Sequence, residues 1–144
     1  LWSRGLGDVY KRQSEHNGAE VNTAKIANET PDLTMFNGHA NQYVFEPLKA
    51  RVGERVRIWV LAAGPSRGCS FHVVGTQFDT VFKEGAYTLK RGNPEGGGCQ
   101  ALDLASAQGG FVEMVFEEPG RYTFVNHSFV EMERGAKGFI EVTT

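Results

Sequence analysis

Short runs of β-branched and aromatic residues, separated by glycine, proline and asparagine, make up most of the chain after Pro31. Runs of this length and composition are typical of β-strands, and the turn residues between them mark where the chain reverses. The runs cover residues 33–36, 48–52, 54–63, 70–75, 79–82, 99–105, 110–118, 121–127 and 138–144. About eight or nine short strands with such punctuation predict an all-β fold, an antiparallel sandwich.

The run 54–63 indicates how these strands are buried. Val56, Ile58 and Val60 alternate with polar or amphipathic residues such as Arg57. Because successive side chains of a strand point to opposite faces, we expect one face on a core and the other toward solvent.

Two segments depart from the strand pattern. Residues 20–29 have apolar residues close to helical spacing, and Pro31 stops the pattern, so we predict one short helix there. Residues 91–98, RGNPEGGG, predict an exposed surface loop.

Charge and motifs exclude several classes of function. The 144 residues include 15 lysine and arginine and 17 aspartate and glutamate, scattered without a basic stripe, which argues against a nucleic-acid partner. No apolar run approaches the roughly 20 residues of a membrane-spanning helix. The sequence also lacks a nucleophile elbow and a Walker motif, so acyl transfer and nucleotide chemistry are poorly supported.

The first thirteen residues, LWSRGLGDVYKRQ, differ in composition from the rest of the chain. The run from Ser3 to Gln13 resembles the translation of a transposase adapter that is attached to DNA for sequencing. We therefore expect residues 1–13 to be a non-native segment. The natural coding sequence would then begin near Ser14 inside a longer gene, as in a metagenomic fragment whose signal peptide is missing.

Histidine and cysteine are the remaining residues that could carry chemistry. The four histidines are His16, His39, His72 and His127. We expect the first two to be exposed, whereas His72 and His127 fall on predicted strands or at their ends. Cys69 and Cys99 could form one disulfide or remain two unpaired thiols, and the sequence leaves both possibilities open.

Two motifs resemble a known family. The segments SFHVVGTQFDTV (70–81) and PGRYTFVNHSFVEMERGAKGFIEV (119–142) look like the C-terminal cupredoxin domain of copper-containing nitrite reductases and related two-domain multicopper oxidases. The resemblance runs from about Pro31 to the end of the chain. It implies a Greek-key, cupredoxin-like β-sandwich over residues 32–144, as the C-terminal domain of a larger protein. Residues 14–31, with the short helix, would be an interdomain linker.

The resemblance also implies a copper site. In the reductases, the histidine of the V-N-H motif completes a three-histidine copper centre between subunits, and the neighbouring subunit's first domain supplies the other two ligands. His127, in Val125-Asn126-His127, would then be a copper ligand in a homotrimer. Three imidazoles leave one position open to a small anion. Oxidases with a trinuclear cluster have H-C-H at this strand end, so this domain cannot build a laccase site alone.

Three further residues enter the expected site. His72, between apolar neighbours, is predicted to be a hydrogen-bonded histidine behind the ligands, with direct copper binding as the alternative. Gln77 occupies, by resemblance, the place of a catalytic histidine, but an amide cannot titrate, so acid catalysis by Gln77 is excluded. Asp79 is then the candidate for orienting water.

The function implied by the resemblance is one-electron reduction of nitrite to nitric oxide by a periplasmic or secreted protein. An absent N-terminal cupredoxin domain would hold the blue copper, and the fragment alone would have little activity. Reduction of oxygen, or oxidation of another small substrate, is a variant within the same architecture. A metal-free β-sandwich that serves assembly or binding is the alternative from a different class.

Overall fold

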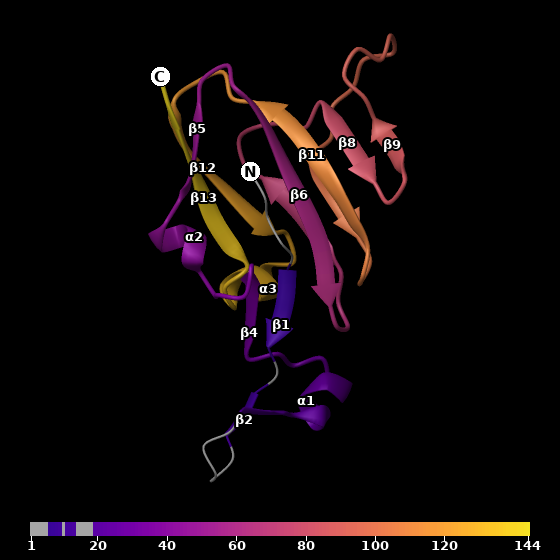
Figure 1. Ribbon diagram of the computed structural model, residues 1–144, viewed down its shortest axis with the longest axis vertical. Coiled ribbons are helices and arrows are strands. Elements are labelled where there is room, and N and C mark those ends of the chain that lie inside the picture. Colours follow the sequence, from indigo (N-terminus) through magenta and orange to yellow (C-terminus); the bar gives the residue numbers. More distant parts are fainter. Residues whose placement is uncertain (1–5, 10, 14–18) are drawn as a thin grey trace.

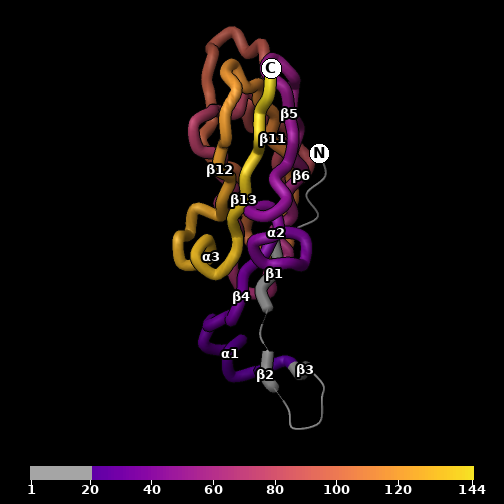
Figure 2. The backbone as a smooth tube through the Cα atoms, turned by 90° about the vertical axis from the view of Figure 1, so that its left-hand side faces the viewer, coloured from indigo at the N-terminus to yellow at the C-terminus, as the bar shows by residue number. Residues whose placement is uncertain are grey.

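A computed structural model describes residues 6–9, 11–13 and 19–144, which form two facing β-sheets with three short helices at their edges (Figures 1 and 2). The first sheet has the order β4 (Leu33–Phe36), β1 (Leu6–Val9), β6 (Arg55–Gly64), β11 (Gly109–Val115), β8 (Thr80–Lys83) and β9 (Ala86–Leu89). The second has the order β10 (Ala101–Leu104), β7 (Cys69–Val73), β12 (Gly120–Asn126), β13 (Lys137–Thr143) and β5 (Leu48–Arg51). The strands β2 (Lys11–Gln13) and β3 (Ala19–Val21) form a separate pair.

The predicted sandwich is confirmed, since each of the nine sequence runs contains a strand. Most neighbouring strands are antiparallel, and the pairs β1–β6 and β5–β13 run parallel. Strand β9 has no counterpart among the predicted runs, because it is a short edge strand with mostly exposed side chains and no inward apolar face to reveal it.

Burial along β6 follows the expected alternation. Val56, Ile58 and Val60 are buried in the core, whereas Arg57 is exposed. The same alternation operates on β7, where Phe71 and Val73 point into the core. Side chains between them on β7 must therefore point away from it.

Phenylalanines from both sheets fill the space between them. Phe36, Phe71 and Phe124 form a cluster with ring centroids 5.3 to 6.1 Å apart, and Phe78 stacks on Phe71. Each such pair contributes about 0.5–1.5 kcal/mol beyond the apolar area it buries. The packing of Phe71 and Phe124 in the core thus holds the paired strands β7 and β12 together, and with them the residues on their outer surface.

The helices are α1 (Thr23–Ala27), α2 (Gln42–Phe45) and α3 (Phe129–Glu133). The predicted helix within residues 20–29 is confirmed as α1, and it begins where the Asn22 side chain accepts a hydrogen bond from the Lys25 amide at 3.1 Å. Among the described residues, none of the helices has the length and apolar character that crossing a bilayer requires.

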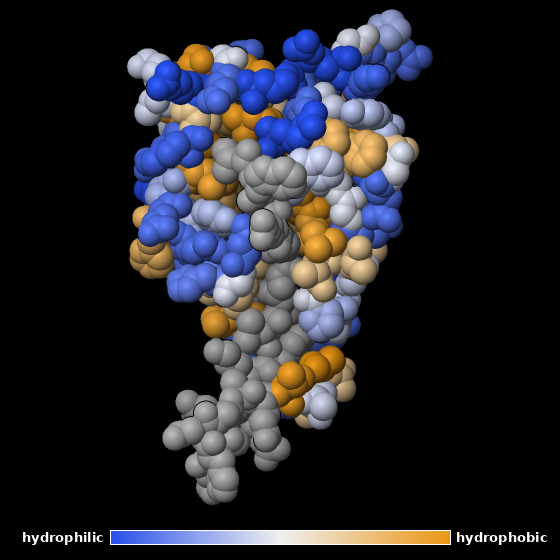
Figure 3. Space-filling view, in the orientation of Figure 1, coloured by the Kyte–Doolittle hydropathy of each residue, from blue (hydrophilic) through white to orange (hydrophobic). Residues whose placement is uncertain are grey.

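The loop 91–98 is exposed throughout, as predicted, and it projects beyond β9 at a strongly hydrophilic end of the molecule (Figures 1 and 3). Within residues 1–13, Leu6–Val9 form β1 between β4 and β6. Pairing does not test where a segment comes from, so the adapter origin stays a prediction. Apart from β1 and β2, residues 1–13 lie outside the described residues, and so does His16.

Candidate metal centre

His127 lies just beyond the end of β12, where the chain leaves the second sheet. Asn126 is buried, and its side-chain oxygen accepts hydrogen bonds from the backbone amides of Ser70 at 3.0 Å and Ser128 at 3.4 Å. The His127 amide donates to the Ser70 carbonyl at 2.8 Å. These bonds hold the backbone on both sides of His127, and its side chain is exposed.

Helix α3 follows β12 in the chain (Figure 2). It begins two residues after His127 and is anchored by Glu131. The Glu131 carboxylate is buried, accepts a hydrogen bond from Thr34 on β4, and accepts another from Arg67 Nη1 at 2.9 Å. Arg67 also donates to Glu29, just after α1, at 3.0 Å. This carboxylate ties the turn that bears His127 to the first sheet.

His72 meets His127 on the outer surface of the second sheet. His72 is paired with Val125 in the β7–β12 register, which makes it a diagonal neighbour of His127. The two ring centroids are 5.3 Å apart and the ring planes are inclined by 70°. Two histidines far apart in the sequence are thus brought together by strand register.

The ring of His72 is held by a hydrogen bond between Nδ1 and the Gln100 carbonyl oxygen. A carbonyl oxygen can only accept, so Nδ1 carries the proton and Nε2 is left without it in the neutral ring. His72 is therefore a hydrogen-bonded histidine, as predicted, but it lies outside the core and next to His127.

Exposed apolar side chains follow each of the two histidines closely in the chain. Val74 is 49% exposed, Phe129 58% and Val130 54%, and the Phe129 ring stacks on that of His127 at 4.8 Å. We call the surface formed by these three residues with His72 and His127 the imidazole face. Exposed apolar groups around polar ligand atoms are typical of a surface that another protein covers.

The donors on the imidazole face fit part of a copper site. Imidazole nitrogen is a preferred ligand of copper, and the structure gives the His127 ring no hydrogen-bond partner among the described residues. The described part of the chain contains no group of three or more His, Cys, Asp or Glu residues placed to hold a metal ion. Further ligands would have to come from outside these residues.

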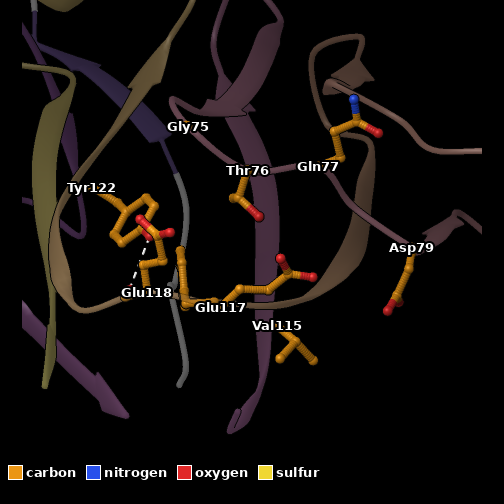
Figure 4. A pocket seen from close by; sticks show the side chains of 9 residues that line it. Gly75, Thr76, Gln77, Asp79, Val115, Glu117, Glu118 and Tyr122 are labelled. Atoms are coloured by element: carbon orange, nitrogen blue, oxygen red, sulfur yellow. Dashed lines mark hydrogen bonds between the residues drawn. The ribbon is translucent and has the colours of Figure 1, made fainter. Parts of the chain in front are cut away.

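Gln77 and Asp79 lie elsewhere. The chain turns at Gly75, which has a φ of +92°, a backbone conformation that side chains disfavour. Beyond this turn Gln77 and Asp79 line a hollow of about 450 Å³ with Glu117 and Glu118, which we call the acidic hollow (Figure 4). Neither His72 nor His127 is among its lining residues.

The Asp79 carboxylate is already engaged. It accepts hydrogen bonds from Arg55 Nη1 at 2.9 Å and Nη2 at 2.7 Å, and Arg55 also contacts Glu113 at 3.1 Å. The hydrogen bonds from Arg55 lower the pKa of Asp79 below its usual value. Asp79 is therefore part of an ion-pair network on the first sheet, and nothing places it beside His127.

The sequence left open whether Cys69 and Cys99 form a disulfide. In the structure both are free thiols. Cys69 is buried, and burial raises the pKa of its thiol to about 12. It points into the core, on the opposite face of β7 from His72. The predicted exposure of His39 is confirmed.

The two sheets, their strand order and the turn with α3 define a cupredoxin-like all-β domain. No protein-family model matches the chain. Its sequence is similar to that of the copper-containing nitrite reductase of Neisseria gonorrhoeae, with 35% identity over 120 residues, which are 82% of this chain and 29% of that protein.

Solved structures agree with this similarity. The chain matches the copper-containing nitrite reductase of Thermus scotoductus SA-01 with a TM-score of 0.79 and 26% identity, over 99% of this chain and 30% of the other. The copper nitrite reductase of Nitrosomonas europaea also gives 0.79, at 22% identity, over 99% of this chain and 48% of the other, and it supports the fold alone. The chain thus spans about a third of the curated relatives it matches.

Proposed function

We propose that this chain is the C-terminal, cupredoxin-like domain of a two-domain copper protein that reduces nitrite to nitric oxide. In this proposal His127 contributes one imidazole to a catalytic copper between subunits of a homotrimer. The observation that carries the proposal is the pairing of His72 with His127, 5.3 Å between ring centroids, on an outer surface with an apolar rim. The similarity to copper-containing nitrite reductases supports the same assignment.

His127 suits a shared site because its backbone is fixed and its ring nitrogens are not engaged by described residues. The amide is bonded to Ser70 and the preceding Asn126 is locked in place. Bound copper would supply the single electron that the reduction requires. Among the described residues, only His72 has its imidazole against that of His127, and His127 is the one ligand proposed from this chain, so a second subunit would supply the others of a three-histidine site.

His72 takes the proton-handling role in this proposal. Reduction of nitrite to nitric oxide and water consumes one electron and two protons, so a group that holds a proton near the bound anion is required. The hydrogen bond from Nδ1 of His72 to the Gln100 carbonyl leaves Nε2 open to a hydrogen bond with a bound anion. Gln77 and Asp79, in the acidic hollow, are not proposed to act on the substrate.

The remaining parts of the proposal concern the whole protein. Residues 32–144 would be the second cupredoxin domain and residues 14–31 the linker, with a preceding domain that holds the blue copper. The low share of the relatives that this chain covers is consistent with such a domain. A periplasmic or secreted location would fit proteins of this kind.

A chimera tests the function. Residues 31–144 would replace the matching segment of the Neisseria gonorrhoeae relative, and copper content and nitrite-dependent nitric oxide formation would be measured. We expect His127→Ala to remove the catalytic copper, while His39→Ala, an exposed histidine away from the imidazole face, leaves it in place. Equal copper in both variants would reject the assignment and favour the metal-free assembly role.

A further inference from the structure

The two histidines of the imidazole face are oriented by different means. His72 donates from Nδ1 to the Gln100 carbonyl, whereas the His127 ring has no hydrogen-bond partner among the described residues. Histidines that bind metals usually have the second ring nitrogen fixed by such a bond, which sets the direction of the ligating nitrogen. If His127 is to bind a metal well, another contact must restrict the rotation of its ring.

The candidate for this restriction is the Phe129 ring. Its centroid lies 4.8 Å from that of His127 and the two planes are inclined by only 26°, so the rings are stacked. His72 contacts the His127 ring at 70°, edge to face. The imidazole of His127 therefore has one neighbour along its face and another at a steep angle.

Burial of Phe129 does not explain its presence. Its side chain is 58% exposed on the first turn of α3, beside Val130 at 54%, and the core is built without either residue. The backbone of the turn is already fixed by Asn126 and Ser70. The freedom left to His127 is rotation of its side chain, and a stacked ring limits that rotation.

We propose that Phe129 is a positioning residue for His127, and that its ring takes the place of the missing hydrogen bond. A ring held in one orientation loses less entropy when it binds a ligand, so stacking should strengthen metal binding by His127. The relevance to copper rests on the proposed function, but the orienting contact itself is a property of the metal-free chain.

The first experiment uses the 144-residue chain without metal. Imidazole proton and nitrogen resonances of His127 and His72 would be recorded for the unmodified chain, Phe129→Ala, Phe129→Leu and Phe129→Trp, with Val130→Ala as the matched control. We expect the His127 resonances to lose their ring-current shift in the alanine and leucine variants and to keep one in the tryptophan variant. The resonances of His72 and of the core should stay in place in every variant.

The second experiment titrates the same variants with copper(II) ions alone and follows the broadening of the His127 resonances. Loss of a group that orients a ligating histidine costs about 10- to 100-fold in metal affinity. We expect about a tenfold loss for Phe129→Ala and Phe129→Leu, recovery in Phe129→Trp, and no change in Val130→Ala.

The outcomes separate the two proposals. Unchanged His127 resonances in Phe129→Ala would overturn the positioning role, whatever the copper result. Changed resonances with full copper affinity would also overturn it, because the orientation would then not matter for binding. If the resonances change as expected but no variant of the isolated chain binds copper, the orienting contact is supported and its stated effect on copper affinity is overturned. The proposed copper function is tested separately, by the copper content of the chimera.

Discussion

Asp79 in the acidic hollow and His127 on the imidazole face differ in how far the chain satisfies their hydrogen-bonding atoms. In the acidic hollow, Asp79 is tied to Arg55 by two hydrogen bonds. On the imidazole face, His127 has ring contacts but no hydrogen bond to a described residue, and the residues around it are exposed and apolar. A side chain whose hydrogen bonds are completed within the chain has a structural role. A side chain that the fold orients, and whose ring nitrogens have no partner among the described residues, is the better candidate for binding a ligand.

The largest expected effect is on activity, and it differs between the imidazole face and the acidic hollow. In the chimera with the Neisseria gonorrhoeae relative, His72→Ala should reduce nitrite-dependent nitric oxide formation by about 10²- to 10⁴-fold, the range for loss of a proton-transfer group, while copper is retained. Gln77→Ala should leave the rate near that of the unmodified chimera. A large loss for Gln77→Ala with little loss for His72→Ala would reverse the assignment of the two regions.

A smaller effect concerns the support of the imidazole face. Replacing Glu131 by alanine leaves the buried Thr34 hydroxyl without its acceptor and should lower the free energy of unfolding by about 1–3 kcal/mol. Glu133→Ala, on the same helix but exposed and 3.9 Å from Lys137, is the control and should change it by less than about 0.5 kcal/mol. Urea unfolding of the 144-residue chain measures both, and similar values would show that α3 is not anchored through Glu131.

The smallest effect tests the acidic hollow. The side chains of Asp79 and Arg55 are 35% and 30% exposed, so Asp79→Asn should cost only about 0.5–1 kcal/mol of unfolding free energy near pH 7. Because the folded-state pKa of Asp79 is lowered, this contribution is present above the unfolded value of about 3.9 and is lost as the pH falls through the folded value. Unfolding curves from pH 7 to pH 3 should therefore converge for the two proteins at the acidic end, and a gap that widens there would contradict the pairing.

Much of the fold could be predicted because its signals are local. The alternation of Val56, Ile58 and Val60 indicated which face of β6 is buried, and Pro31 marked the end of α1. Strand β9 was missed because none of the residues Ala86–Leu89 is fully buried. Strand β1 was missed because residues 1–13 were expected to be a non-native segment and no element was predicted there.

The site was predicted in part for the same reason. The V-N-H motif marked His127, whose position follows directly from the end of β12. The contact between His72 and His127 depends on the register between β7 and β12, and this register could not be predicted from the sequence. Gln77 was placed in the site by resemblance, and the structure places it beyond the turn at Gly75, among the residues that line the acidic hollow.

The central claim is that His127 of one subunit binds a copper held also by another subunit. Two inactive forms of the chimera would be expressed together, one with His127→Ala and one with the copper-binding histidines of its first domain replaced. If the site is shared between subunits, mixed trimers should regain about a third of the catalytic copper and of the activity, because one of their three interfaces combines two intact halves. No recovery in mixed assemblies of confirmed composition would contradict the claim.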